Sequence, residues 1–466
     1  MQKLFEEVST LDARCYNEFH LSEDILMEHA ANGIASYIKR NFSNTHKITI
    51  VTGSGNNGAD GLALARLLHG DYNTSILFAK KPKSSMASLQ EKRVNALNIP
   101  IISDIQECDI IIDAIVGTGF KGKFDENISS LLHDMNTAEA FKIACDVPSG
   151  LKKDGQCVQQ TFQADVTLTM GALKKSLFLD EAKNFTGDVK VIDLGISRTL
   201  YETQSNWQLL DEKDLQLPLR KEQNSHKGSF GHLAIVCGEK HGASIISGLA
   251  ALNFGAGLVT LVGYENQQML SIPYSLMYAH ALPKNTSAIA CGMGLGVEFS
   301  DDELKNFLNN ELPVIVDADL FHMQMILEIL KRKDLVLTPH PKEFVSLLKI
   351  TNIADINVDQ LQTKRFEYVT LFCKTYPNAT LLLKGANVII GKNENFFINP
   401  HGNSKLAKGG SGDVLSGLIG SLLAQGRNTL DAAIHASLAH TRLAQNYDGA
   451  DFSLTPEDLI EGIGNL

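Results

Sequence analysis

The stretch KITIVTGSGNNGADGLALARLL, residues 47–68, decides the fold of the N-terminal half of the chain. It begins as an apolar strand over 47–53, passes through a glycine-rich GxGxxG turn over 53–58 and continues as the helical pattern DGLALARLL. Glycines at such a turn let the backbone approach a ligand closely, and the following helix N-terminus favours an anion. The stretch therefore predicts a strand–turn–helix unit of an α/β sheet with a ligand-binding loop.

Further apolar runs of strand length follow this unit, and they are typical of parallel strands covered on both faces. Residues 198–224 interrupt the series, because they are polar and contain Pro218, and a second series follows. The first series continues over 75–80, 109–117, 141–150, 165–171 and 189–195, and the second spans 232–238, 257–263, 288–294, 313–319, 334–340 and 380–386. The sequence thus predicts two α/β domains, a Rossmann-like doubly wound domain over 1–210 and a second one over 222–466.

The composition is that of an ordinary globular protein, with 44% hydrophobic and 20% charged residues. A net charge of −11 argues against nucleic-acid binding, which leaves a basic footprint. The seven cysteines include no CxxC pair, which favours reduced thiols over a disulfide framework. Glu6 and Glu7 stand where a signal peptide needs an apolar core. We therefore expect a cytoplasmic protein.

One uncharged stretch, from His241 to Tyr264, is long enough to span a bilayer. It contains five glycines, and Gly255 and Gly257 bracket a helix stop. The pattern favours a buried helix over about 243–254, a turn and the strand LVTLV instead of a membrane span.

Polar side chains recur where the N-terminal strands end. Asn56, Asn57 and Asp60 lie in the first turn, Asp113 closes IIID ahead of GTGFKG, and Asp146 closes KIACD ahead of VPSG. Because the carboxyl ends of parallel strands meet at one edge, these loops are expected to converge on one crevice. Taken singly, a plain tight turn over 53–58, helix capping by Asp113 and turn formation by Asp146 remain open.

Together these motifs resemble the YjeF N-terminal family, the NAD(P)HX epimerases, over roughly residues 1–210. The resemblance rests on LMEHA (26–30), GSGNNGADG (53–61), DAIVGTGFKG (113–122) and DVPSG (146–150). The implied substrate contacts are Asn56, Asn57, Gly58, Ala59, Asp60, Gly117, Thr118, Gly119, Phe120, Lys121, Gly122, Lys123 and Asp146, and the implied potassium ligands are Asn57, Asp113 and Ser149. Ala59 replaces a family glycine, which would strain the backbone if its φ were positive.

Epimerisation at C6 of the hydrate needs a C–O or ring C–N bond to open and re-form on the other face. A positioned acid or base accelerates such a step. Asp146 is the first candidate for this group and Lys121 is the second.

The strongest single motif is KGGSGDVLSG over 408–417, which heads the apolar helix pattern LIGSLLA. Amides at a helix start stabilise developing phosphoryl charge, and a carboxylate in the first turn can accept a hydroxyl proton. Asp413 holds that first-turn position. A glycine-rich cap with a capping aspartate is the alternative, and it does not explain three glycines at 409, 410 and 412.

The C-terminal half resembles the ribokinase-like YjeF C-terminal family, the ADP-dependent NAD(P)HX dehydratases. HKGSFGHLAIVCG (226–238), GMGLG (292–296), VDADL (316–320), LTPHPKEF (337–344), LLKGANVII (382–390) and KGGSGDVLSGLIGSLLAQG (408–426) carry the match. The implied NAD(P)HX contacts are Ala243, Gly294 or Gly296, His340 and Asp413, and the implied nucleotide contacts are Lys384, Gly385, Ala386, Asn387, Val388, Gly410, Ser411 and Gly412. Mg²⁺ is expected on the phosphates, with Glu343 as a candidate ligand.

The resemblance implies that Asp413 deprotonates the substrate hydroxyl, which attacks the β-phosphate of ADP. AMP leaves, and the ring nitrogen then expels phosphate. The expected partners are NADHX, NADPHX and ADP, with no nucleic acid and no membrane, and the resemblance implies a homo-oligomer.

Two other functions stay open at the level of sequence. A ribokinase-like vitamin or sugar kinase with a dinucleotide-sensing N-terminal domain shares the GSGD loop. A non-catalytic dinucleotide-binding module has no need of the intact set of Asn57, Asp113 and Asp146.

Overall fold

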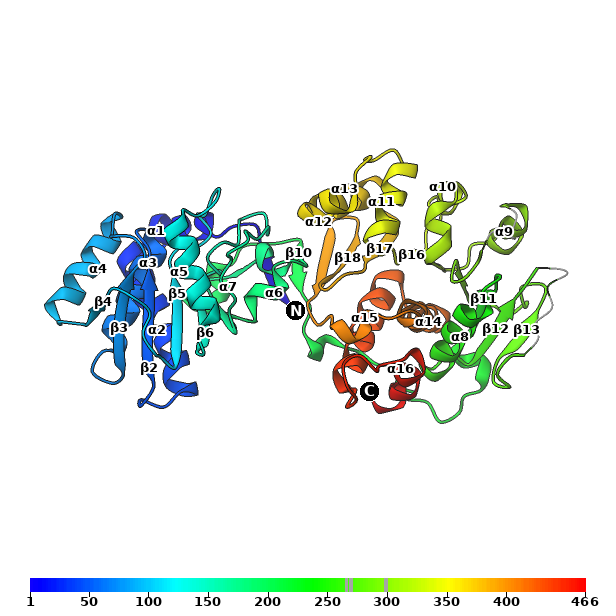
Figure 1. Ribbon diagram of the computed structural model, residues 1–466. Helices are drawn as coiled ribbons and strands as arrows, with labels where there is room; N and C mark the ends of the chain where they lie inside the picture. The colour runs from blue at the N-terminus through cyan, green and yellow to red at the C-terminus, as the bar shows by residue number, and fades with distance from the viewer. Residues whose placement is uncertain (265–266, 268–270, 297–300) are drawn as a thin grey trace. The chain divides into compact units, whose positions relative to one another are not determined.

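The computed structural model describes residues 1–264, 267, 271–296 and 301–466. These residues form two compact units, an N-terminal unit over Gln2–Ser205 and a C-terminal unit over Asn206–Leu466 that includes Met1 (Figure 1). The boundary lies within the polar stretch 198–224, which the sequence marks as the connection.

A parallel sheet forms the centre of the N-terminal unit, in the order β4-β3-β2-β5-β6-β7-β9. The chain winds outward in both directions from the β2–β5 pair, and open α/β sheets bind ligands at such a switch point. The strands are β2 (Lys47–Thr52), β3 (Asn73–Phe78), β4 (Ile101–Ile102), β5 (Ile110–Ala114), β6 (Phe141–Cys145), β7 (Val166–Met170) and β9 (Asp188–Ile192). A separate parallel pair joins β1 (Gln2–Phe5) and β8 (Leu173–Lys174).

Helices cover both faces of this sheet, because successive residues of a strand point to opposite sides. Ile110 and Ile112 are buried in one core with α2 and α3, whereas Ile111 is buried in a second core with α5. The helices are α1 (Ser9–Glu18), α2 (Glu23–Asn41), α3 (Asn56–Leu68), α4 (Ser85–Ala96), α5 (Glu126–Thr137), η1 (Lys175–Phe178), α6 (Lys183–Thr186) and α7 (Arg198–Tyr201). The predicted doubly wound fold is confirmed.

The C-terminal unit is built on a longer sheet, in the order β13-β12-β11-β14-β15-β16-β17-β18-β19-β10. All neighbours pair in parallel except β18, which runs antiparallel to β17 and to β19. The strands are β10 (Trp207–Leu209), β11 (His232–Val236), β12 (Leu258–Val262), β13 (Met277–Ala279), β14 (Ala288–Cys291), β15 (Val314–Val316), β16 (Leu335–Leu337), β17 (Ala379–Leu383), β18 (Val388–Lys392) and β19 (Asn395–Asn399). The expected α/β class holds for this unit as well.

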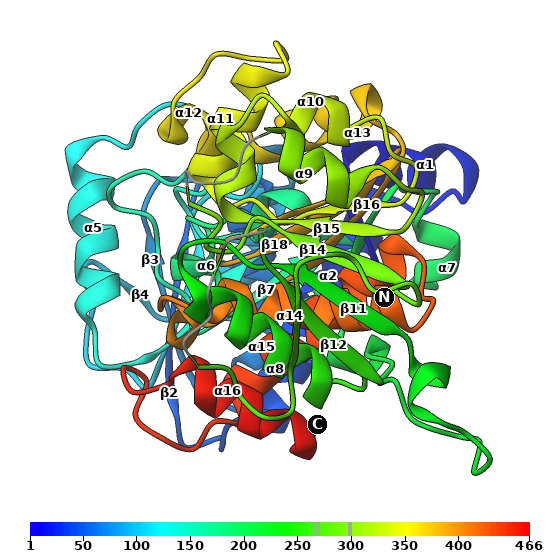
Figure 2. The ribbon, with the colours of Figure 1, turned by 90° about the vertical axis from the view of Figure 1, so that its right-hand side faces the viewer.

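Two groups of helices enclose this sheet, one on each side (Figures 1 and 2). One group is α8 (His241–Asn253), α14 (Ser411–Ala424), α15 (Thr429–Asn446) and α16 (Pro456–Gly462), and the other is α9 (Asp301–Leu308), α10 (Ile326–Ile329), α11 (Pro341–Ile350), α12 (Val358–Thr363) and α13 (Arg365–Thr375). Every residue of α14 from Val414 to Ala424 is buried. A Cβ on Gly417 would lie 2.2 Å from the carbonyl oxygen of Ser247, so glycine permits α14 to press against α8.

The uncharged stretch from His241 to Tyr264 folds as the sequence predicts, with α8 followed by a turn and β12. Gly255 has a φ of 104°, the left-handed conformation expected just after a helix end. Within the described ranges, no helix combines the length and the apolar character needed to cross a membrane.

Candidate active sites

The N-terminal unit contains a cavity of about 720 Å³ where β2, β5 and β6 end. The lining residues include these predicted substrate contacts: Asn56, Asn57, Asp60, Gly117, Thr118, Gly119, Phe120, Lys121, Lys123 and Asp146. Gly58, Ala59 and Gly122 are not among them. Gly58 and Ala59 are buried in the first turn of α3, and a Cβ on Gly58 would lie 2.1 Å from the carbonyl oxygen of Gly53.

Ala59 raises no backbone strain, because it is a helical residue of α3 and is absent from the residues with positive φ. Its methyl group is completely buried beside Met27, Met86 and Ala87. The alanine therefore fits this site, and the strain that a positive φ would have brought does not arise.

Asn57 is a polar residue of the first loop whose side chain has no hydrogen-bond partner among the described residues. Both polar atoms of its side chain are buried without a hydrogen-bond partner, whereas the amide of Asn56 donates to Glu23 Oε1 at 2.6 Å. A Cβ on Gly117 would lie 3.6 Å from Asn57 Oδ1, so the amide faces the second loop. A buried amide without partners costs about 1–3 kcal/mol, and a ligand at this point would remove that cost.

Asp113 and Ser149, two predicted potassium ligands, are bonded to each other. The Ser149 hydroxyl donates to Asp113 Oδ1 at 2.6 Å, and the Ser149 amide donates to Oδ2 at 2.7 Å. Burial raises the pKa of Asp113 to about 6, against the lowering effect of these hydrogen bonds. Within the described part of the chain no group of three His, Cys, Asp or Glu side chains is arranged to hold a metal, so any ion here would rely on amide, hydroxyl and single carboxylate oxygens.

Asp146 follows β6 with a φ of 73°, a conformation that aspartate adopts more readily than most residues. Its Oδ1 accepts hydrogen bonds from Lys174 Nζ at 2.6 Å and from the Met170 amide at 3.2 Å. Its Oδ2 is the atom nearest to Gly117, 3.1 Å from where a Cβ would stand. One oxygen is thus held inside the protein, and the other faces the cavity loop.

Sequence reasoning missed several residues at the acidic end of this cavity. Asp12 and Tyr16 of α1 and Glu23 of α2 line it, and the Tyr201 hydroxyl donates to Asp12 Oδ1 at 2.7 Å. Burial raises the pKa of Asp60 well above its ordinary value, and the carboxylates of Asp146, Asp12 and Glu23 add to the effect. The LMEHA motif pointed to α2, but no sequence signal marks Asp12.

In the C-terminal unit, α14 begins directly after Gly410, which has a φ of 88°. The amides of Gly412 and Asp413 lie in the first turn and have no acceptor within the helix. The Ser411 amide already donates to the Lys408 carbonyl at 3.3 Å, and the Ser411 hydroxyl lies 3.1 Å from His440 Nε2. Of the predicted anion-binding amides, those of Gly412 and Asp413 are therefore the ones best placed to donate to a ligand, because the Ser411 amide already has an acceptor.

Asp413 carries the carboxylate nearest to these amides. Among the interactions of the described residues, its side chain has no hydrogen bond and no ion pair, while its carbonyl oxygen accepts from the Ser247 hydroxyl at 2.8 Å. Burial and the neighbouring carboxylate of Asp317 raise the pKa of Asp413 to about 6, and the ammonium of Lys384 opposes them. This is a half-buried carboxylate that is ready to take a proton near neutral pH.

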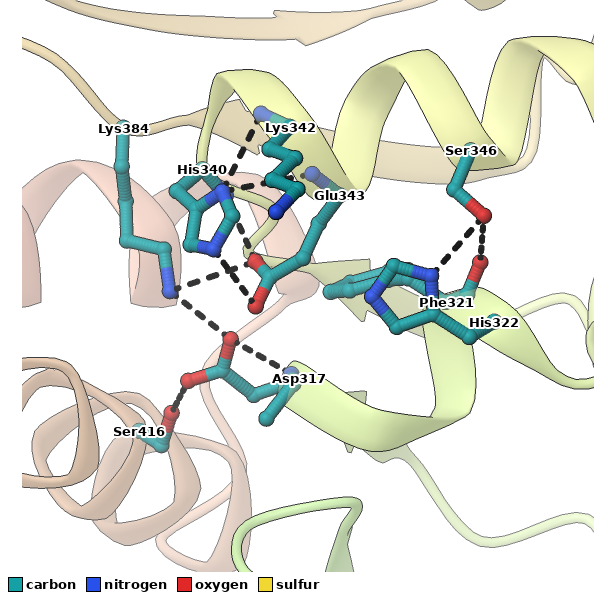
Figure 3. A network of polar contacts seen from close by, with 10 residues as sticks. Asp317, Phe321, His322, His340, Lys342, Glu343, Ser346, Lys384 and Ser416 are labelled. Atoms are coloured by element: carbon teal, nitrogen blue, oxygen red, sulfur yellow. Dashed lines mark hydrogen bonds and ion pairs between the residues drawn. The ribbon is translucent and has the colours of Figure 1, made fainter.

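A polar network that includes Asp317, Lys384 and Ser416 lies beside the glycine-rich loop at the start of α14 (Figure 3). Lys384 Nζ contacts Asp317 Oδ1 at 2.8 Å, and the Ser416 hydroxyl donates to Asp317 Oδ2 at 2.7 Å. A Cβ on Gly412 would lie 3.5 Å from Lys384 Nζ, so the ammonium lies next to the amides. Burial lowers the pKa of Lys384, but Asp317 and Glu343 outweigh it, and the net shift is upward. The ammonium of Lys384 therefore stays charged beside the turn that is predicted to bind an anion.

His340 is used as a helix cap. Its Nδ1 accepts from the amides of Lys342 at 3.1 Å and Glu343 at 3.2 Å, and its Nε2 lies 3.2 Å from Glu343 Oε1 (Figure 3). Pro341 occupies the first turn of the helix. The prolines that flank this histidine thus belong to a capped helix start, and the ring, which is 46% exposed, still borders the Lys384 network.

The structure places the predicted contacts Ala243, Gly294 and Gly296 near one another or near Asp319. A Cβ on Gly294 would lie 3.0 Å from Ala243 Cβ, and the Gly296 amide donates to Asp319 Oδ2 at 2.9 Å. Asp319 in turn helps to raise the pKa of Asp413. The predicted nucleotide contacts Lys384–Val388 follow β17, with Ala386 exposed and Asn387 and Val388 buried.

The fold and these two sites define a class, a two-domain α/β enzyme with one candidate ligand site in each unit. Two family models match its sequence. The model described as "YjeF-related protein N-terminus" matches residues 23–176, and the one described as "NAD(P)H-hydrate dehydratase" matches residues 233–464.

The chain is 40% identical to the bifunctional NAD(P)H-hydrate repair enzyme Nnr of Helicobacter pylori, over 100% of both chains. It is 33% identical to the Escherichia coli K12 enzyme of the same name, over 84% of this chain and 79% of that one. The chain therefore belongs to the family of bifunctional NAD(P)H-hydrate repair enzymes, which confirms the resemblance seen in the motifs. The structure of the Bacillus subtilis ADP/ATP-dependent NAD(P)H-hydrate dehydratase co-crystallized with ATP/Mg2+ is 27% identical and covers 55% of this chain and 94% of its own, with a TM-score of 0.46.

Proposed function

We propose that this chain repairs hydrated nicotinamide dinucleotides. Its N-terminal unit interconverts the R and S epimers of NADHX and NADPHX, and its C-terminal unit converts the S epimer to NADH or NADPH, using ADP and releasing AMP and phosphate. Membership of the family supports both activities, and so does the presence of one candidate site in each unit.

The dehydration step is proposed to start at Asp413, whose carboxylate takes the proton of the substrate hydroxyl. The freed oxygen attacks the β-phosphorus of ADP, the bond to AMP breaks, and the ring nitrogen's lone pair then expels phosphate as the C6–O bond breaks. Loss of the C5 proton restores the dihydropyridine. The amides of Gly412 and Asp413, with Lys384 beneath them, would stabilise the transferring phosphoryl group, which needs positioning and charge more than covalent help.

The epimerisation step is proposed to use Asp146 Oδ2, which faces the cavity loop, as the acid and base that moves the hydroxyl proton at C6. Lys121, which lies exposed on the second loop and lines the cavity, is the second candidate. Asn56, Asp60 and the loop over 117–123 would hold the dinucleotide around the reacting ring.

The residues fit a potassium ion in this unit. The amide oxygen of Asn57 is buried without a partner, and Asp113 and Ser149 offer a carboxylate and a hydroxyl oxygen behind the same loop. When bound, the ion would supply a fixed positive charge near the substrate. Asn57 would hold it from α3, and Asp113 and Ser149 from the ends of β5 and β6.

The expected role of Glu343 as a magnesium ligand stays a prediction. Its Oε2 accepts the His340 amide at 2.7 Å and its Oε1 lies 3.2 Å from His340 Nε2, so the carboxylate also belongs to the capped helix start. Magnesium usually enters phosphoryl-transfer sites on the substrate phosphates and keeps several waters, so no step is assigned to Glu343. The homo-oligomeric state and cytoplasmic location stay predictions.

The observation that carries the proposal is the Asp413 carboxylate at the start of α14, which lies next to the Lys384–Asp317 pair and makes no hydrogen bond or ion pair with any described residue. Purified protein given mixed NADHX epimers and ADP is expected to recover all of the substrate as NADH. Without ADP, a sample of pure S epimer is expected to relax to an R and S mixture faster than a protein-free blank. Unchanged epimers with and without ADP, together with ATP-dependent phosphorylation of a small alcohol, would instead support the kinase.

A pH dependence follows from Asp413, whose pKa is raised to about 6. The base must be ionised, so about nine tenths of the enzyme is competent at pH 7 and about one tenth at pH 5. The kcat/KM of dehydration is therefore expected to fall about tenfold per pH unit below pH 6. Dehydration rates measured from pH 5 to 8 with saturating ADP test this. A flat profile down to pH 5 would remove Asp413 as the base.

A further inference from the structure

The two oxygens of Asp146 are held unequally. Oδ1 accepts from Lys174 Nζ at 2.6 Å, from the Met170 amide at 3.2 Å and from the Thr169 hydroxyl at 3.4 Å. Oδ2 has no such contact among the described residues and points to the loop at Gly117. The contacts of Oδ1 therefore fix the orientation of this carboxylate.

Lys174 makes the shortest of these contacts and is itself enclosed, with a side chain only 1% exposed. It lies on the short strand β8, beside β1, and does not line the cavity. Its ammonium donates to Asp146 Oδ1, to the Thr169 hydroxyl at 2.8 Å and to the Met170 carbonyl at 3.1 Å. An ammonium has three donors, and all three are used within the protein, so none remains for a substrate.

The ammonium also stands among carboxyl groups from several elements. Asp12 of α1 and Asp60 of α3 both line the same end of the cavity as Asp146, and Tyr201 of α7 bonds to Asp12. Burial raises the pKa of Asp12, the hydrogen bond from Tyr201 lowers it, and the charge of Lys174 also lowers it. A buried ion pair is weak evidence of a gain in stability, because apolar side chains of similar volume often serve as well. Its place beside the cavity points to a role in the site.

We propose that Lys174 is a positioning residue of the epimerisation site, which holds Oδ1 of Asp146 so that Oδ2 is presented to the substrate. The inference rests on the proposed epimerase function and on Asp146 as its acid and base. Lys174 does not touch the substrate and acts only through Asp146.

The test compares four proteins: the wild type, Lys174→Met, Asp146→Asn and the double variant. Epimerisation of pure S-NADHX is followed by separating the epimers without ADP. Lys174→Met is expected to lower kcat by about 100-fold and to change KM little, because a misplaced group loses rate more than binding. In the Asp146→Asn background the same replacement is expected to change kcat by less than about threefold, since residues that act as one unit are not additive.

Two internal controls separate this role from a general loss of structure. Lys175, the next residue, pairs with the exposed Glu6 at 2.5 Å and does not line the cavity, so Lys175→Met is expected to epimerise at the wild-type rate. ADP-dependent dehydration belongs to the other unit and is expected to be unchanged in every variant. Thermal melting checks that each variant is folded.

A folded Lys174→Met variant whose kcat stays within about threefold of the wild type would overturn the proposal. So would an equal loss of kcat in the wild-type and Asp146→Asn backgrounds, because Lys174 would then act independently of Asp146. If Lys174→Met does not fold, Lys174→Leu makes the same comparison, since its apolar side chain also cannot donate to Oδ1. A wild-type protein that does not epimerise NADHX would defeat the proposed function instead.

Discussion

Asp413→Asn is expected to lower the kcat of ADP-dependent dehydration by about 10²–10⁴-fold, the range of loss when a general base is removed. Asparagine keeps the shape of the side chain and the amides of the α14 first turn, but it cannot accept the hydroxyl proton. Recovery of NADH absorbance from S-NADHX and ADP measures the loss. Epimerisation in the N-terminal unit is expected to be unaffected.

A matched control for this variant exists in the next helix. Asp431 stands at the same position relative to its helix start, three residues after the capping Asn428, as Asp413 does relative to Gly410. Its carboxylate accepts a hydrogen bond from the side-chain amide of Asn428 at 2.7 Å and belongs to neither candidate site. Asp431→Asn is therefore expected to keep full dehydration. Normal NADH recovery in Asp413→Asn would defeat the assignment.

The stability of Asp413→Asn provides a second check. The folded protein raises the pKa of Asp413 above its ordinary value, so the ionised form is disfavoured on folding and destabilises the protein at pH 7. Replacing this carboxylate with a neutral amide is expected to leave Tm unchanged or to raise it. A loss of activity without a loss of stability would mark Asp413 as a functional residue and not as a structural cap.

Asp146→Asn is expected to produce the complementary loss, a fall of about 10²–10⁴-fold in the rate of epimerisation with dehydration of S-NADHX unchanged. Asparagine tolerates the positive φ at this position, so the turn itself is retained. The rate of R and S interconversion without ADP, with KM measured separately, tests the expectation. Normal binding together with a normal rate would exclude Asp146.

This variant also removes the partner of a buried charge. Lys174 would remain 1% exposed without its carboxylate, and breaking a buried ion pair typically costs about 3–5 kcal/mol. Tm is therefore expected to fall in Asp146→Asn, in contrast to Asp413→Asn. Asp165→Asn is the control, because Asp165 lies away from the site. Its carboxylate accepts the Lys142 amide at 2.8 Å just before β7, at the end of the sheet where the strands begin.

One feature of the C-terminal sheet, the antiparallel hairpin, was not predictable from apolar runs. The hairpin of β18 and β19 runs antiparallel to β17, and it turns through Asn393, whose φ is 53°. Neither strand of this hairpin is among the strands predicted from the sequence, whose series ends at 380–386. The direction depends on which neighbour completes the sheet, and that is a property of the assembled fold.

The sequence by itself determined the two α/β units and the loops that carry chemistry. Apolar runs of strand length and glycine turns are local features, so they place Asn57, Asp113, Asp146 and Asp413 at strand ends and helix starts without knowledge of the fold. Only the tertiary structure decided which side chains support them. The partners of Asp146 and Asp317 lie 28, 67 and 99 residues away, at Lys174, Lys384 and Ser416, and no local pattern encodes contacts that packing alone brings within hydrogen-bond distance.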